Sequence, residues 1–157
     1  MSRQHNYNAT IKWTGNNGTG TSGYKNYERS HEISIENKTT IMASSDPSFR
    51  GDKTKHNPED LLVSSVSTCH MLWYLHLCSE AGVVVMEYID NVKGTMVETS
   101  NGGGKFVEIT LQPMVTVKEP SMVEKANELH HMANKLCYIA NSLNFPVNHI
   151  AKTEYLK

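Results

Sequence analysis

Three cysteines are the residues of this chain whose type best suits covalent or redox chemistry. Cys69 stands in VSSVSTCHML and Cys137 in NKLCYIAN, 68 positions apart, so the chain has neither a CxxC redox turn nor the ligand spacing of a zinc knuckle. Spacing alone therefore assigns no role to either thiol. Because free cysteine is among the most buried residue types, inert core packing is the ordinary interpretation, and we adopt it for Cys78 in LHLCSEAG.

The eight histidines make a metal site the first alternative chemistry. His130 and His131 are close to Cys137 in sequence, but on a helix the two rings point about 100° apart, and residues at i and i+7 lie roughly 10 Å apart. His70 adjoins Cys69, yet neighbouring helical side chains diverge and no oxyanion-hole motif accompanies them, which disfavours a Cys-His hydrolase. We therefore expect no metal and interpret His130 and His131 as a solvated or interface pair.

The length, composition and charge of the chain limit the classes of protein to which it can belong. A chain of 157 residues with 38% hydrophobic residues can form one ordinary core, so we expect a single domain over residues 1–157. The net charge of −1 gives no reason to expect a nucleic-acid partner or an anionic membrane. The segment MSRQHNYNAT lacks the apolar stretch of a signal peptide, and no run approaches the roughly 18 apolar residues of a membrane span. We expect a soluble cytoplasmic protein with free thiols.

The elements that must position the thiols begin with a small antiparallel sheet. Short β-like segments at residues 9–13, 31–35 and 40–44 are separated by clusters of Gly, Asn and Ser. Asn57 is then a good N-cap, Pro58 suits the first helical position and Gly82 a stop, which predicts a helix over residues 58–81. Its apolar residues occupy more than one stripe, so we expect a central helix that is buried on most sides.

The second half predicts two further strands, a helix and a last strand. Residues 88–99 and 106–118 read as strands joined by SNGGG, and Pro113 is expected to mark a bulge or an edge. Ser121 and Glu124 resemble a capping box that starts the helix EKANELHHMANKLCYIANSL, with Cys137 near its end. With a strand at 151–156, the order is βββ-α-ββ-α-β, an α+β layer arrangement.

The segment NPEDLLVSSVSTCH closely resembles the sequence around the reactive cysteine of the OsmC/Ohr family, the osmotically inducible and organic hydroperoxide resistance proteins. The resemblance continues in order through nearly all 157 residues. It implies an OsmC-like fold, in which antiparallel sheets pack around two central helices, usually as an intertwined homodimer with two active sites at the subunit interface. His70 and Tyr138 stand where family patterns often show an apolar residue and a proline.

What the resemblance implies is a two-cysteine thiol peroxidase that reduces organic or lipid hydroperoxides. Cys69 matches the peroxidatic cysteine and Cys137 the resolving cysteine. Glu59, from the Asn-Pro-Glu motif, matches the carboxylate that orients an arginine against the thiolate. We assign that arginine to Arg50, with Arg29 as the alternative, because family members do not all supply it from the same segment.

The chemistry of these assignments requires no metal or flavin. A thiolate attacks the peroxide, a fixed guanidinium stabilises that thiolate and the alkoxide that leaves, and the resulting sulfenic acid condenses to a disulfide. An external dithiol, such as that of a lipoylated protein, must reduce this disulfide. Trp73 is given an ordinary core or interface role. The residues expected to favour organic peroxides by burying an alkyl tail are Met71, Leu72, Met132, Tyr138 and Phe145.

The spacing of Glu59 and Cys69 sets a geometric condition, because ten residues of straight helix span about 15 Å. We predict a bend within residues 63–68, where serine and β-branched residues have weak helix propensity. A bend would place Cys69 near a new helix N-terminus, which favours a thiolate. Otherwise the long Arg50 side chain must bridge much of the gap. The alternative function is a non-catalytic redox sensor or a hydrophobic-ligand binder of the same fold, and a metal protein is the third class.

Overall fold

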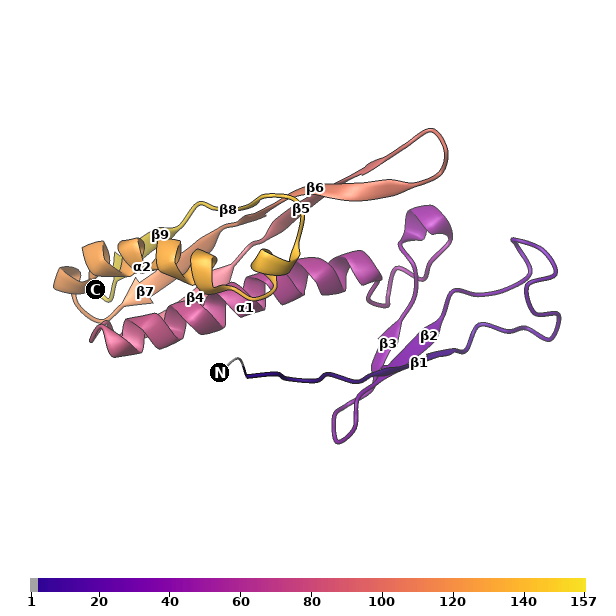
Figure 1. Cartoon of the computed structure of the whole chain (residues 1–157), viewed down its shortest axis with the longest axis horizontal. Coiled ribbons are helices and arrows are strands. Elements are labelled where there is room, and N and C mark those ends of the chain that lie inside the picture. Colours follow the sequence, from indigo (N-terminus) through magenta and orange to yellow (C-terminus); the bar gives the residue numbers. More distant parts are fainter. Residues whose placement is uncertain (1–2) are drawn as a thin grey trace. The chain divides into compact units, whose positions relative to one another are not determined.

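In the computed structural model, which describes residues 3–157, the chain forms two compact units, residues 1–61 (unit 1) and residues 62–157 (unit 2) (Figure 1). The expectation of one domain over residues 1–157 stays a prediction. The observed order is three strands, a long helix, four strands, a second helix and two strands, with three short 3-10 turns. The α+β class is therefore confirmed.

Unit 1 contains the antiparallel sheet β1-β2-β3, formed by Thr10–Trp13, His31–Ser34 and Ile41–Ala43, as expected. A 3-10 turn, η1, follows at Pro47–Phe49 and ends at Arg50, which has a left-handed φ of 66°. At the next residue, Gly51, an added Cβ would come 1.5 Å from the Ser45 carbonyl oxygen. Only glycine fits there, so this turn fixes the backbone on both sides of Arg50.

Helix α1 runs from Pro58 to Glu80, close to the expected bounds. Asn57 is the N-cap, because its side chain accepts from Asp60 N–H at 2.7 Å while the Asp60 carboxylate accepts from Asn57 N–H at 3.3 Å. Gly82, at φ 72°, follows the helix, and Val83 N–H donates to the Cys78 carbonyl at 2.8 Å. Both expected helix boundaries are confirmed.

The predicted bend of α1 within residues 63–68 is wrong, because the helix is uninterrupted (Figure 1). The hydroxyls of this segment bond to carbonyls of the preceding turn, Ser65 to Leu62 at 2.7 Å and Thr68 to Ser64 at 2.8 Å. Side chains that bond in this way satisfy themselves within the helix and need not break it. No second helix N-terminus therefore forms beside Cys69.

Within one chain α1 buries one face only, whereas it was expected to be buried on most sides. Leu72, on another face, is 63% exposed. By length and composition α1 could also cross a membrane, although the sequence was expected to contain no such segment. The core helix of a globular protein can have the same length and composition, and α1 contributes to the core of unit 2. The buried side chains of α1 are Val66, Ser67, His70, Tyr74 and Cys78.

The strands of unit 2 form two mixed sheets. Each of the two long strands expected from the sequence is divided: β4 (Val85–Asp90) and β5 (Lys93–Glu98) replace the first, and β6 (Gly104–Leu111) and β7 (Pro113–Val117) replace the second. The missed strand β8 (Val147–His149) pairs in parallel with β6, and β9 (Lys152–Tyr155) pairs in parallel with β7. The strand orders are β4-β7-β9 and β5-β6-β8.

The division of the long strands is fixed by a carboxylate. Asp90 accepts from Gln112 N–H at 2.7 Å and from the Ser67 hydroxyl at 2.5 Å, so the residue between β6 and β7 bonds to a side chain. Pro113, which cannot donate, is the first residue of β7, where it pairs with Asp90. It begins the middle strand of its sheet and thus marks a strand break, neither the edge nor the bulge that was expected.

Helix α2 spans Val123–Leu136 and follows the 3-10 turn η2 at Pro120–Met122. Its N-cap is Met122 without a side-chain cap, so the predicted capping box of Ser121 and Glu124 is wrong. The helix is also shorter than expected, since Cys137 is its C-cap with extended backbone and a 3-10 turn, η3, follows at Ala140–Ser142.

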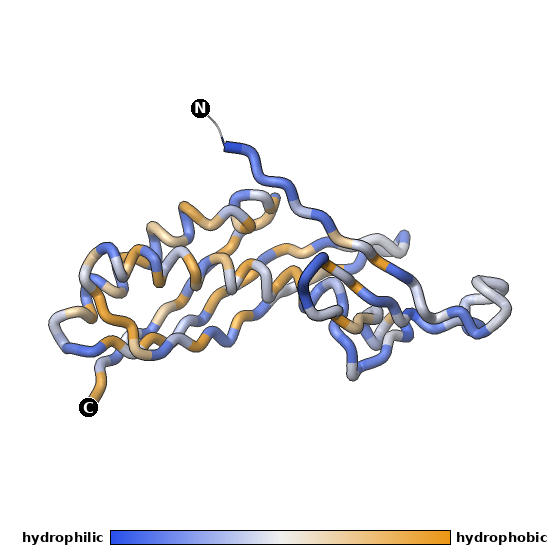
Figure 2. The backbone as a smooth tube through the Cα atoms, turned by 90° about the horizontal axis from the view of Figure 1, so that it is seen from below, coloured by the Kyte–Doolittle hydropathy of each residue, from blue (hydrophilic) through white to orange (hydrophobic). Residues whose placement is uncertain are grey.

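The core of unit 2 is built where α1 and α2 meet the sheets. Figure 2 shows hydrophobic and hydrophilic residues interleaved along the strands of this unit, as one-sided sheets require. Ala126 and Ala133, two turns apart on α2, are fully buried. Their small side chains allow α2 to pack closely against the rest of the main core cluster. The main cluster contains Tyr74, Cys78, Val83, Val115, Val117, Ala126 and Ala133, and a second cluster contains Val66, Ile109 and Leu111.

Candidate active site

Cys69 lies on α1 at the edge of an apolar cavity of about 340 Å³. The thiol is partly exposed, in contrast to the neighbouring His70, which belongs to the buried face of the helix. Trp73 and Tyr138, which both line the cavity, make an edge-to-face contact at 5.6 Å between ring centroids. The cavity is lined by Cys69, Leu72, Trp73, His76 and Tyr138.

Cys137 is fully buried at the end of α2, next to Cys69. Burial raises the pKa of the Cys137 thiol well above its ordinary range, and the neighbouring Cys69 thiol raises it further. The Ala140 N–H, which donates to Cys137 Sγ at 3.4 Å, lowers it in part. The structure thus brings the two cysteines together and gives them different surroundings, because only Cys69 faces the cavity.

Cys78 has the environment of a structural cysteine. It is 1% exposed in the main core cluster, and burial raises the pKa of its thiol. Cys78 does not line the same cavity as Cys69. It lines a separate hollow together with Leu75 and Val85. The sequence-based interpretation of Cys78 as core packing agrees with this position.

Glu59 and Arg50 both lie in unit 1. One carboxylate oxygen of Glu59, Oε2, is buried and has no hydrogen-bond partner among residues 3–157. Arg50 is exposed and its guanidinium makes no hydrogen bond to the described residues. Since ten residues of uninterrupted helix span about 15 Å, α1 itself does not bring Glu59 to Cys69.

Arg29, the alternative arginine, is held rigidly within unit 1. Its guanidinium donates to the carbonyls of Tyr27 at 2.6 Å and Tyr24 at 2.8 Å. The same group lies over both tyrosine rings, 4.1 Å and 4.4 Å from their centroids. Trp13 packs edge-on against Tyr27 and donates to the Glu28 carbonyl at 2.8 Å. These contacts give Arg29 a structural role in the loop that follows β1.

A buried pair of histidines is another feature of unit 2 that the sequence did not predict. His70 Nε2 and His130 Nδ1 are 3.0 Å apart, and neither ring is exposed. Burial lowers the pKa of His70 to about 4 and that of His130 to about 3, with further contributions from nearby histidines. The expectation that His130 and His131 form a solvated or interface pair is wrong for His130.

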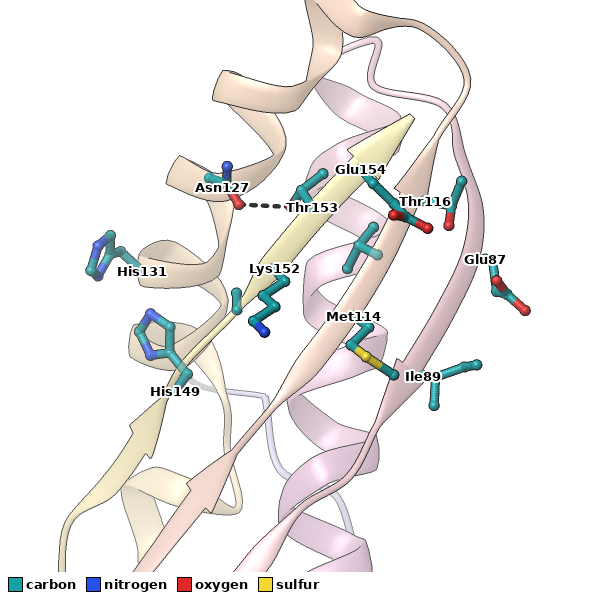
Figure 3. A pocket seen from close by; sticks show the side chains of 12 residues that line it. Glu87, Ile89, Met114, Thr116, Asn127, His131, His149, Lys152, Thr153 and Glu154 are labelled. Carbon is teal, nitrogen blue, oxygen red and sulfur yellow. Dashed lines mark hydrogen bonds between the residues drawn. The ribbon is translucent and has the colours of Figure 1, made fainter. Parts of the chain in front are cut away.

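A larger cavity of about 780 Å³ lies on the sheet β4-β7-β9 and contains no cysteine (Figure 3). His131 and His149 stand together at its edge, with ring centroids 5.0 Å apart. Lys152, Glu87 and Glu154 make this surface polar, unlike the apolar surroundings of Cys69. No group of three or more His, Cys, Asp or Glu side chains among residues 3–157 has the arrangement to hold a metal ion.

The lining of the Cys69 cavity corrects part of the sequence-based expectation. Leu72 and Tyr138 contribute to it as expected. Met71, Met132 and Phe145 do not line it, and Phe145 packs against the second core cluster instead. Trp73 and His76 were missed, although their spacing of four and seven residues from Cys69 places them on the same helix face.

The chain is similar to proteins of one family. The family model for OsmC-like proteins matches residues 51–152. The structure resembles that of an OsmC-like protein of unknown function from Vibrio cholerae, with a TM-score of 0.85 and 24% identity over 95% of this chain and 100% of that chain. No curated protein sequence matches this chain.

Two further solved structures have names that refer to peroxides. An organic hydroperoxide resistance protein from Elizabethkingia anophelis, with crystallant-derived thiocyanate bound, gives a TM-score of 0.67 at 15% identity over 99% of this chain and all of that chain. An organic hydroperoxide resistance protein OsmC from Legionella pneumophila gives 0.66 at 12% identity over 98% of this chain and 99% of that chain. At these identities the likeness shows the fold.

The buried histidines predict a loss of stability in acid. An unfolded histidine binds a proton near pH 6.5, whereas folded His70 binds one only near pH 4. Between these pH values the unfolded state binds more protons than the folded state. The contribution of the neutral His70 to the free energy of unfolding is therefore complete above pH 6.5 and is lost as the pH falls toward 4. One such histidine lowers the free energy of unfolding by about 3 kcal/mol at pH 4, which urea denaturation at several pH values measures.

The control is the double variant His70→Gln and His130→Asn, which removes both titrating rings and keeps polar atoms in place of the bonded nitrogens. Its stability should fall less steeply than that of the wild type between pH 6.5 and 4. Equal slopes in the two proteins would show that neither histidine is responsible.

Proposed function

Because this chain belongs to the OsmC-like protein family, whose model matches residues 51–152, we propose that it is a thiol-dependent peroxidase that reduces organic hydroperoxides in oxidative stress defence. The organic hydroperoxide resistance proteins with the same fold support this role at the level of the family. One observation carries the proposal: a partly exposed thiol, Cys69, opens onto an apolar cavity and has a buried second thiol, Cys137, beside it.

In the first step, the Cys69 thiolate attacks the outer peroxide oxygen. The O–O bond breaks, Cys69 becomes a sulfenic acid, and the remaining alkoxide takes a proton to leave as the alcohol. Cys137 is unsuited to this step because burial keeps it as a neutral thiol without access to the cavity. The aromatic and aliphatic lining of the cavity favours a peroxide with an apolar tail over hydrogen peroxide, because such a tail is removed from water.

In the second step, the Cys137 sulfur attacks the sulfenic acid, a disulfide forms and one water leaves. The disulfide protects Cys69 from further oxidation. An external dithiol, such as that of a lipoylated protein, then reduces it to complete the cycle. We propose no resident metal or organic cofactor, since the cycle needs only the two thiols, the peroxide and the reductant.

We assign the thiolate-stabilising cation to Arg50 and its orienting carboxylate to Glu59. The Arg50 guanidinium has no hydrogen bond among residues 3–157 and lies 6.0 Å from the centroid of the Tyr24 ring, whereas Arg29 donates to two carbonyls and lies closer to two rings. The unpartnered Glu59 Oε2 belongs to a carboxylate that can hold a guanidinium in a fixed orientation through paired hydrogen bonds.

We also propose that the active protein is a homodimer. Leu72 on α1 and Tyr138 beside the cavity are 63% and 69% exposed, although both are large and apolar in character. Only 22% of the most apolar stretch of α1 is buried within one chain. A second copy that covered this helix would remove the exposed surface and would enclose the cavity at Cys69.

The cysteine assignments are tested by single-residue variants in an assay of cumene hydroperoxide consumption with dithiothreitol. Cys69→Ser should abolish turnover. Without dithiothreitol, Cys137→Ser should consume about two equivalents of peroxide, one to form the Cys69 sulfenic acid and a second to over-oxidise it to the sulfinic acid, whereas the wild type should stop after about one equivalent as the disulfide. Cys78→Ala is the matched control and should keep wild-type turnover. Tight binding of an apolar ligand without peroxide loss would instead favour a hydrophobic-ligand binder or a redox sensor.

The arginine assignment predicts that Arg50→Ala slows the oxidation of Cys69 by about a hundredfold, the usual effect of removing one fixed donor from a developing negative charge. Stopped-flow measurement of the first oxidation step provides the rate. Arg29→Ala serves as the control and should mainly lower the melting temperature, because it loosens the loop after β1. A large rate loss in Arg29→Ala with little effect in Arg50→Ala would transfer the role to Arg29.

The homodimer predicts a molar mass twice that of the 17.6 kDa chain in sedimentation equilibrium. Leu72→Glu places a charge on the exposed apolar side of α1 and should shift the mass toward that of one chain. Val97→Glu, at a strand position that is 42% exposed, is the control and should stay dimeric. A wild-type mass of a single chain at micromolar concentration would contradict the homodimer.

A further inference from the structure

One buried hydrogen bond joins the two helices that carry the thiols. His70 of α1 and His130 of α2 meet through Nε2 and Nδ1 at 3.0 Å, and both rings are fully buried. The two rings are nearly parallel, with an interplanar angle of 4°. Tyr74 stacks on His130 at 3.9 Å between centroids. A directional bond between two buried, nearly coplanar rings, one of which is stacked on Tyr74, permits few relative positions of the helices.

This bond is adjacent to the thiols in the covalent structure. His70 follows Cys69 directly on α1, and His130 precedes Cys137 by about two turns on α2. Because both elements are regular helices, a shift or rotation of α2 at His130 is passed on to the end of the helix at Cys137. The histidine pair thus lies where a change in the alignment of the two helices would alter the position of Cys137 relative to Cys69.

We propose that the His70–His130 hydrogen bond is a positioning device that holds Cys69 and Cys137 in register for disulfide formation. Its part in a catalytic cycle rests on the proposed function, but its effect on the disulfide does not. Disulfide geometry is strict, with Cα atoms about 4.4 to 6.8 Å apart and a preferred torsion, so a small displacement of α2 disfavours the bond. A Cys69 sulfenic acid that is not captured by Cys137 remains open to a second peroxide.

The pair offers matched replacements because each ring has one bonded and one free nitrogen. His70 Nδ1 and His130 Nε2 have no partner among residues 3–157. Glutamine places an amide where Nε2 stands and asparagine places one where Nδ1 stands. His70→Gln and His130→Asn therefore keep a polar group at the bond, whereas His70→Asn and His130→Gln move it away, with the same chemistry and similar size.

The first measurement is the equilibrium of the Cys69–Cys137 disulfide with reduced and oxidised dithiothreitol, followed by alkylation and mass spectrometry of the intact protein. His70→Asn and His130→Gln should weaken the disulfide by up to about tenfold, a ceiling set by the net free energy of one buried hydrogen bond. His70→Gln and His130→Asn should stay within about twofold of the wild type, because they restore the bond. All measurements are made well below each melting temperature, so that a change in global stability alone does not alter them.

The second measurement is the partition of oxidised Cys69 between disulfide and sulfinic acid after one equivalent of cumene hydroperoxide. The two variants that lose the bond should form more sulfinic acid, while the rate of the first oxidation of Cys69 stays unchanged in all four. If His70→Asn does not fold, His130→Gln tests the same bond from the other helix. Equal disulfide equilibria in matched and mismatched variants would overturn the proposal.

The two proposals fail in different ways. If peroxide does not oxidise Cys69 in the wild type, the peroxidase function is wrong, yet the equilibrium with dithiothreitol still decides the role of the histidines. If peroxide is consumed normally and the mismatched variants keep wild-type disulfide stability, the function stands and the positioning role is wrong.

Discussion

The rotation of α1 about its own axis is the constraint on which the rest of unit 2 depends. His70, Tyr74 and Cys78 recur every four residues and form the face that packs into the core. Since successive helical residues are turned by about 100°, Cys69 points away from that face and opens onto the cavity. Burial of one side of α1 therefore determines where the Cys69 thiol is presented.

Polar contacts fix this arrangement at two points where apolar packing alone would permit slippage. Asp90 joins Ser67 of α1 to the backbone between β6 and β7, and the histidine pair joins α1 to α2. Buried hydrogen bonds add little net stability, because the same groups bond to water in the unfolded chain, but a mispositioned partner leaves them unsatisfied. These contacts act chiefly by excluding other alignments of the same hydrophobic surfaces.

The sequence predicted the elements whose causes are local and missed those whose causes are distant. Asn57 and Gly82 define the ends of α1 through bonds within a few residues, and both were identified. The division of the long strands was missed because it depends on Asp90, which lies 22 positions from its partner Gln112. The predicted bend was wrong because α1 continues through residues 63–68 despite their weak helix propensity, which tertiary packing routinely overrides.

The site shows the same division between local and distant causes. Cys69 and Cys137 were selected by a resemblance in sequence, and their roles stay a prediction, but the structure places the two thiols side by side where α2 packs on α1. The partner of His130 was missed, because a histidine 60 positions away supplies it and no periodicity indicates that contact. Trp73 and His76 were within reach of sequence reasoning, since both fall on the helix face of Cys69.

The contrast between the two thiols also constrains how a disulfide between them can be reduced. A dithiol can approach only the Cys69 sulfur, because Cys137 is fully buried and does not line the cavity. Attack there makes Cys137 the leaving group, and a thiol whose pKa is raised by burial leaves slowly. In the proposed cycle, the burial of Cys137 would therefore slow reduction of the disulfide, and the Ala140 N–H that points at its sulfur would offset part of that effect.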